Sequence, residues 1–181
     1  MALISASTIL TSICLFHVTL AYFFYTNPHA IADQALVWVL GEAVGMPQTQ
    51  SFSTPSPTSS FLAVILFLVG ISDLITLSMP EEIWLVHYWG SQAPARIVVF
   101  GSLTLFTYLT TPSTTTARLN HFPPAYGTGS GSEGLRNRVF FAFTFFECLS
   151  WFWAWVTLRE EAIAFAARKR RRSSSSAKER S

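Results

Sequence analysis

Four long apolar runs constrain this chain more than any other feature. They cover residues 4–24, 61–79, 95–111 and 139–158. A helix needs about 20 apolar residues to cross a bilayer core about 30 Å thick, and a small soluble domain rarely hides four helices that are apolar on nearly every face. Half of the residues are hydrophobic and only 12% are charged, which is typical of a membrane protein. The sequence therefore predicts an all-α membrane protein, a bundle of four transmembrane helices.

The segment 28–45, between the first two spans, predicts one more helix. It begins with Pro28, at a position where helices often start, and ends at Gly45. Asp33 and Glu42 are nine residues apart and project to opposite sides of such a helix. Burying each carboxylate in the membrane would cost about 2 to 3 kcal/mol. We therefore expect an interfacial or re-entrant helix, with a full crossing as the alternative.

The C-terminal end carries most of the positive charge. From Arg159 onward it holds eight of the twelve basic residues, and basic segments stay in the cytosol by the positive-inside rule. Four spans then place the N-terminus and Arg96 on that same side, whereas a crossing by residues 28–45 would move only the N-terminus. The prediction divides the chain into a transmembrane domain, residues 1–161, and a basic, Ser-rich cytosolic tail, residues 162–181.

A basic run in this tail has several interpretations. Each basic residue near an anionic membrane gains about 1 kcal/mol, and phosphate added to the following serines would cancel that attraction. The run also resembles endoplasmic-reticulum retention signals, or it acts only as a topology anchor. It lacks interleaved aromatic residues, so direct binding of nucleic acid is not expected. The run is Arg168, Lys169, Arg170, Arg171 and Arg172, and the candidate phosphosites are Ser173, Ser174, Ser175 and Ser176.

An aromatic-rich stretch precedes the third span. Aromatic residues with polar edges are typical of the headgroup level of a membrane. We expect the third span to begin only after Pro94. The residues of this interfacial cluster are Trp84, His87, Tyr88 and Trp89.

Three ionisable residues lie well inside the predicted spans, away from their ends, namely His17, Asp73 and Glu147. An ionisable residue inside a membrane is a functional candidate, and its alternative role is a hydrogen-bonded packing group. At about 1.5 Å of rise per residue, His17 and Glu147 lie at similar depths and can pair if their helices touch. Glu147 shares a small, polar stripe with Ser150, and Asp73 shares one with Thr76, so both acids are expected to face other helices.

The remaining polar and aromatic residues indicate no chemistry. Trp151, Trp153 and Trp155 are expected to face lipid or the interface. The two cysteines, Cys14 and Cys148, lie within predicted spans and are expected to be reduced packing residues. The sequence holds no metal-ligand spacing, no Gly-rich phosphate loop and no nucleophile elbow. We therefore expect no cofactor and no enzymatic activity.

Four strings of the sequence are distinctive as a set: LFHVTLAYFF, AIADQALVWVLGEA, GISDLITLSMPEEIWLVHYWGSQAPAR and ECLSWFWAWVTLREE. Together they resemble the fungal family named for increased loss of mitochondrial DNA, over most of residues 1–161. The resemblance implies a small multi-pass protein of the endoplasmic reticulum membrane with a link to mitochondrial genome maintenance. It transfers no active-site residue.

The functional prediction is a non-enzymatic membrane factor of the endoplasmic reticulum that supports mitochondrial genome maintenance indirectly. Its expected partners are the lipid bilayer, anionic lipid at the tail, and a membrane protein or a second copy of the chain. One alternative is a lipid- or sterol-binding protein or isomerase, with His17, Glu147 and a tryptophan around a cavity. The other is a cation or proton pathway along Asp73, Thr76 and Glu147.

Overall fold

The structure is a computed structural model, and it describes residues 4–48, 52–110 and 134–179. These residues form helices and no strand. The elements in chain order are α1 (Ala6–Thr26), α2 (Pro28–Ala32), α3 (Ala35–Val44), α4 (Pro57–Thr76), the π-helix η2 (Ile83–Tyr88), α5 (Trp89–Thr110) and α8 (Arg138–Glu179).

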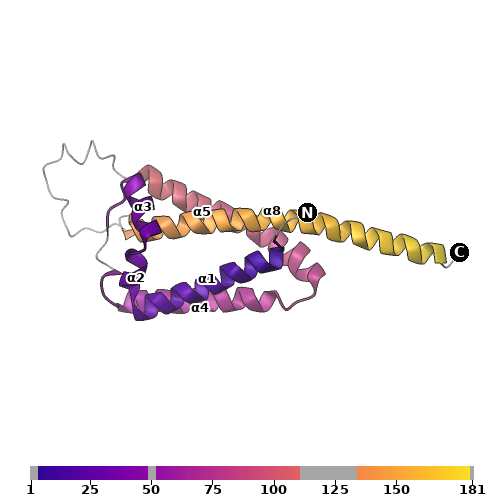
Figure 1. Ribbon diagram of the computed structural model, residues 1–181, viewed down its shortest axis with the longest axis horizontal. Helices are drawn as coiled ribbons and strands as arrows, with labels where there is room; N and C mark the ends of the chain where they lie inside the picture. The colour runs from indigo at the N-terminus through magenta and orange to yellow at the C-terminus, as the bar shows by residue number, and fades with distance from the viewer. Residues whose placement is uncertain (1–3, 49–51, 111–133, 180–181) are drawn as a thin grey trace.

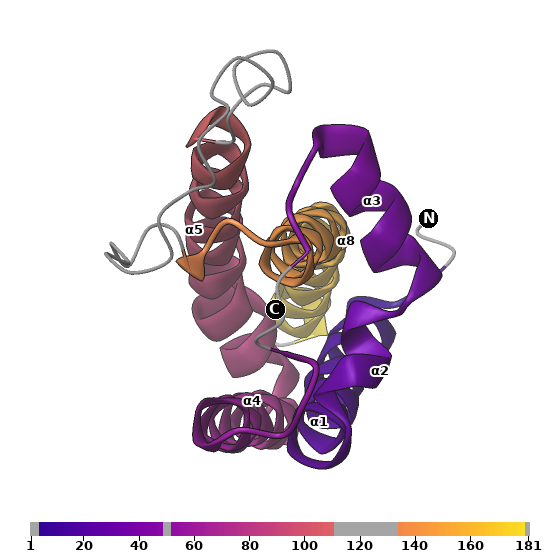
Figure 2. The same ribbon diagram turned by 90° about the vertical axis from the view of Figure 1, so that its left-hand side faces the viewer.

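Within the described residues, four helices are long and apolar enough to cross a membrane: Ala6–Thr26, Pro57–Thr76, Ile83–Thr110 and Arg138–Ser175. Consecutive spanning helices run antiparallel to each other (Figure 1). Seen end-on, α1 packs beside α4, and α8 lies between this pair and α5 (Figure 2). The predicted fold class, an all-α membrane protein with four spans, is confirmed.

Two short helices, α2 and α3, lie across one end of the four-helix bundle (Figure 1). The 10 residues of α3 extend only about 15 Å, half of what a bilayer crossing needs. In place of the single helix expected over 28–45, the structure has two helices separated by Asp33 and Gln34. Neither of them runs along the length of the bundle (Figure 1). Gly45 ends α3 in the left-handed conformation, with φ 71°.

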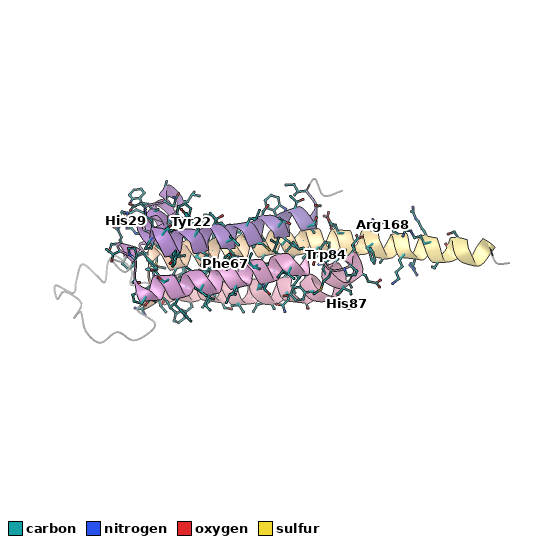
Figure 3. The ribbon with its side chains drawn as sticks, turned by 90° about the horizontal axis from the view of Figure 1, so that it is seen from below. Tyr22, His29, Phe67, Trp84, His87 and Arg168 are labelled. Carbon is teal, nitrogen blue, oxygen red and sulfur yellow. The ribbon has the colours of Figure 1, made fainter. Side chains whose placement is uncertain are left out.

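We call the end covered by α2 and α3 the hairpin end, and the opposite end, from which α8 extends, the tail end. Tyr22 and His29 mark the hairpin end, and Trp84, His87 and Arg168 mark the tail end (Figure 3). The 42 residues of α8 amount to about 63 Å of helix. This is about twice the thickness of a bilayer core, so α8 continues well beyond the bundle.

The third spanning helix differs from the sequence-based prediction. It begins in the π-helix η2, before Pro94, and Pro94 lies inside α5. A proline inside a membrane helix is tolerated because neighbouring groups can satisfy the freed backbone carbonyl. Trp84 and Trp89 are therefore buried in the bundle rather than placed at its surface. Of the same aromatic cluster, His87 is exposed and Tyr88 is half-buried.

Buried apolar side chains form two separate cores. One lies at the tail end and contains residues of α1, η2, α5 and α8. The other lies at the hairpin end and contains residues of α1, α2, α3, α4 and α8. Between them, buried polar residues form a layer across the bundle. The tail-end core contains Ala6, Leu10, Ile13, Trp84, Leu85, Trp89, Ala93, Trp151, Ala154 and Leu158. The hairpin-end core contains Ala21, Phe24, Ile31, Val37, Ala63, Leu66, Val139 and Ala142.

Close backbone contact holds α1 against α4. A side chain added at Gly70 would lie 3.0 Å from the carbonyl oxygen of Cys14 and 3.0 Å from a methyl group of Val18. At the tail end, a carboxylate oxygen of Glu161 accepts a hydrogen bond of 2.7 Å from the first backbone N–H of α1, at Ala6. A carboxylate at a helix N-terminus is favoured by the helix dipole, and this one joins α8 to α1.

Candidate functional site

The buried polar layer begins with a contact between α1 and α8. Nε2 of His17 lies 3.0 Å from Oε1 of Glu147, and their side chains are 4% and 1% exposed. The contact is a hydrogen bond, and it is an ion pair when the imidazole is protonated. Two residues that the sequence placed at similar depths therefore meet directly. Nδ1 of His17 is buried and has no hydrogen-bond partner among the described residues.

Trp151 forms a hydrogen bond with the second oxygen of the Glu147 carboxylate. Its indole Nε1 donates a hydrogen bond of 2.8 Å to Oε2 of Glu147, one turn earlier in α8. The expectation that Trp151 faces lipid is therefore wrong, since it is 1% exposed. The indole N–H needs an acceptor in an apolar environment, and the buried carboxylate supplies it. Trp153, by contrast, is largely exposed, as expected of a lipid-facing residue.

A second pair joins α4 to α5. Arg96 donates two hydrogen bonds to the carboxylate of Asp73, at 2.6 and 2.9 Å. The side chain of Asp73 is only 3% exposed and that of Arg96 is 22% exposed. The sequence alone did not predict this pair, because a third span that starts at Ala95 leaves Arg96 at the membrane surface. A start at Ile83 would have placed the arginine inside the bundle and opposite the acid.

The two pairs are joined through aromatic rings. The guanidinium of Arg96 lies over the ring of Trp151, 4.5 Å from its centroid, and over Trp89 at 5.3 Å. The two indoles stack on each other with centroids 5.3 Å apart. A cation over an indole is stabilised by the negative face of the ring, most strongly where water is absent. Asp73, Arg96, Trp151, Glu147 and His17 thus form one continuous network that takes at least one residue from each of the four spanning helices.

The charges of this network nearly balance. Asp73 and Arg96 cancel each other, and the charge of Glu147 is balanced when His17 carries a proton. An isolated charge in an apolar interior costs many kcal/mol, whereas a paired and hydrogen-bonded one is tolerated. We call these five residues, Asp73, Arg96, Trp151, Glu147 and His17, the polar lock.

The other candidate residues inside the spans lie beside the polar lock. The hydroxyl of Thr76 donates a hydrogen bond of 2.7 Å to the backbone carbonyl of Asp73, in its own helix. Ser150 is half-buried on α8. Thr76 therefore contacts the backbone of Asp73, whereas the carboxylate of Asp73 is held by Arg96.

The basic run of the tail divides into two parts. Arg168 and Lys169 form ion pairs with Glu81 and Glu82, at 3.1 and 2.6 Å. The hydrogen bond and the charge of Lys169 lower the pKa of the Glu82 carboxyl. These contacts fasten α8 to the segment before η2, and they were not predicted from the sequence.

Residues 170–175 are exposed helix. The side chains of Arg170, Arg171 and Arg172 are exposed. The candidate phosphosites Ser173, Ser174 and Ser175 are also exposed, and their hydroxyls donate to carbonyls of the preceding helical turn. The side chain of Ser176 lies outside the described part of the chain.

No group of three His, Cys, Asp or Glu side chains among the described residues could hold a metal ion. Cys14 is buried and Cys148 is half-buried, and both are free thiols. The three ionisable residues that the sequence singled out inside the spans each lie against another side chain of the polar lock.

Four apolar helices fastened by a buried layer of paired charges define an integral membrane protein of the helical-bundle class. The family model described as "Increased loss of mitochondrial DNA protein 1" matches residues 4–168, and the chain belongs to that family. The family predicted from the four sequence strings is thus confirmed. No curated protein and no solved structure matches the chain.

Proposed function

We propose that the protein is a non-enzymatic membrane factor of the endoplasmic reticulum that supports mitochondrial genome maintenance indirectly, and that the polar lock is structural. Membership of the family supports the link to mitochondrial DNA. The observation that carries the structural role is that both carboxylates of the lock are hydrogen-bonded through both oxygens to side chains of this chain. A carboxylate that acts as a catalytic acid or base needs an oxygen free for its substrate.

The same contacts do not favour a cation pathway along Asp73, Thr76 and Glu147. A permeant cation would need the carboxylate oxygens as ligands, yet Arg96 holds those of Asp73 and carries a positive charge itself. The arginine would repel a cation that approached Asp73. The network therefore favours a fixed helix arrangement over conduction.

The placement of the tail in the cytosol belongs to this proposal and rests on its charge. Eight of the twelve basic residues of the chain lie from Arg159 onward. In the structure both the start of α1 and the extension of α8 lie at the tail end (Figure 1). We propose that residues 162–181 form the cytosolic tail and that the exposed run Arg170 to Arg172 meets anionic lipid.

The test compares lock variants in two assays. Asp73→Asn and Glu147→Gln proteins, reconstituted in vesicles, are assayed for cation and proton flux, and cells that carry them are scored for retention of mitochondrial DNA. A structural lock predicts no flux in the parent protein and loss of mitochondrial DNA in proportion to the loss of folded protein. Flux in the parent that either variant abolishes would instead establish a pathway and overturn the proposal.

A further inference from the structure

An apolar groove opens at the hairpin end between α1, α2, α3 and α8. It is a cavity of about 260 Å³. Its lining is aromatic and aliphatic, with only two polar residues, Thr19 and Gln34. The residues that shape it include Phe16, Leu20, Phe23, Val37, Ala142 and Phe146.

The groove is long enough for most of one lipid chain within one leaflet. Along α1 it extends from Phe16 to Phe24, which is about 12 Å at the rise of an α-helix. One leaflet of the hydrocarbon core is about 15 Å deep. The volume falls just below the range of about 300 to 1,000 Å³ that encloses drug-sized ligands. A single acyl chain therefore suits the groove better than a bulky ring system does.

A polar cavity adjoins the groove. It measures about 200 Å³ and is lined by Asp33, Trp38, Gln48 and Arg138, among others. Val139, the residue after Arg138, lines both cavities. The two cavities thus share a wall residue at the start of α8.

Arg138 is held in position over α3. Its Nε donates to the carbonyl of Met46 and its Nη2 to the carboxylate of Glu42, both at 2.8 Å. Its aliphatic stem packs so closely on α3 that a side chain added at Gly41 would collide with it. Among the described residues, these two acceptors leave Nη1 unused. The guanidinium is therefore oriented in advance, with a donor left over.

The acidic side of the cavity is Asp33, at the break between α2 and α3. Its side chain is 55% exposed and lies 2.8 Å from Nδ1 of His29. Trp38, also on the cavity wall, is 56% exposed. A carboxylate beside an open indole face is the environment that binds an alkylammonium group.

We propose that the hairpin end binds one zwitterionic phospholipid. One acyl chain lies in the groove, the phosphate accepts hydrogen bonds from Arg138, and the ammonium group lies against Asp33 and Trp38. Arginine is well suited to phosphate because its planar fork matches the phosphate oxygens. Arg138 and Asp33 both line the polar cavity, while their partners Glu42 and His29 do not, so the wall offers a base to the phosphate and an acid to the ammonium. An anionic lipid without an amine would offer no ammonium group to Asp33.

The probes for this site are phosphatidylethanolamine and phosphatidylglycerol with identical chains. The full-length protein is stripped of lipid, incubated with each probe in mild detergent, and examined by native mass spectrometry. We expect one phosphatidylethanolamine per chain, and an affinity for phosphatidylglycerol lower by about tenfold, since one charge-assisted contact is lost. Equal retention of the two lipids would overturn the headgroup assignment.

Two variants test the apolar half of the site. Ala30→Phe puts a ring on α2 at the wall of the groove and should abolish retention of both lipids. Ala43→Phe makes the same change at an exposed position of α3 that lines neither cavity, and should retain lipid as the parent does. Retention by Ala30→Phe equal to that of Ala43→Phe would refute the groove.

Asp33→Asn tests the headgroup without altering the apolar lining, and because Asp33 is 55% exposed the change removes no buried contact. It should remove the preference for phosphatidylethanolamine while leaving one lipid bound. If the preference persists, the ammonium is not held by Asp33 and the proposal fails at that contact. These lipid-binding measurements are independent of the structural role proposed for the polar lock. That role would be overturned by ion flux, which is measured separately.

Discussion

Arg96 meets Asp73 through two parallel hydrogen bonds, from Nη1 to Oδ2 at 2.6 Å and from Nη2 to Oδ1 at 2.9 Å. The acid is buried in α4 and the base comes from α5, so the pair fastens one membrane helix to the next. Lysine could not make this forked contact, because its ammonium is a single point of charge.

Removing one partner of this pair should be more harmful than removing both. Asp73→Asn leaves the Arg96 charge uncompensated, and breaking a buried pair costs about 3 to 5 kcal/mol. Asp73→Leu combined with Arg96→Met replaces both charges by apolar groups of similar size and should recover most of the loss. Thermal unfolding in detergent, followed by tryptophan fluorescence, measures both. A double variant no more stable than Asp73→Asn would contradict the pairing.

The carboxylate of Glu147 accepts hydrogen bonds from two donors. Glu147→Leu leaves the imidazole of His17 and the indole of Trp151 without their acceptor, and each unsatisfied buried group costs about 1 to 3 kcal/mol. Glu147→Gln keeps one acceptor oxygen and should lose less. The matched control is Glu160→Gln, an exposed position of the same helix. Unfolding temperatures that do not separate Glu147→Leu from this control would show that the contact is unimportant.

Two glycines of the spans should respond oppositely to alanine. Gly70→Ala places a methyl group 3.0 Å from the backbone oxygen of Cys14, so α1 and α4 must move apart, at a cost of about 1 to 3 kcal/mol. At Gly101 the nearest atom to such a methyl group is Sγ of Cys148 at 3.6 Å, an ordinary contact. Gly101→Ala should therefore be neutral, or stabilising by up to about 1 kcal/mol through helix propensity. The same thermal assay decides between these outcomes, and similar losses in both variants would count against the close contact of α1 with α4.

The contact between α8 and the segment before η2 should weaken in acid. Lys169 lowers the pKa of Glu82, mainly through its hydrogen bond. Because the pKa is lower in the folded protein, the stabilising contribution is complete above the ordinary pKa of a glutamate. It is lost as the pH falls through the lowered value.

Hydrogen exchange of residues 162–172 measures this loosening. Exchange should rise as Glu82 becomes protonated, after correction for the intrinsic pH dependence of exchange. Glu82→Gln should show the loosened state already at neutral pH, while the neighbouring pair of Arg168 with Glu81 keeps part of the contact. Identical protection in Glu82→Gln and the parent at all pH values would show that the ion pair does not hold the tail.

Some features of the site followed from local sequence, and others depended on the ends of helices. The depth of His17 and Glu147 could be counted along each apolar run, because every residue adds the same rise to a helix. Arg96 could not be placed that way, because a proline two residues before it suggested a helix start and the structure continues the helix through it. The error also moved Trp89 from the interior to the surface.

The sequence by itself determined the class of the protein, its four spans and the end at which positive charge gathers. Apolar content and charge bias act locally, through the cost of placing each residue in hydrocarbon or water, so they need no knowledge of neighbours. Only the tertiary structure decided which acid meets which base, that Trp151 turns inward to Glu147, and that α2 and α3 cover one end. Those choices depend on the rotation and the crossing angle of each helix. Both are set by packing between helices, so they do not follow from the sequence of any one helix.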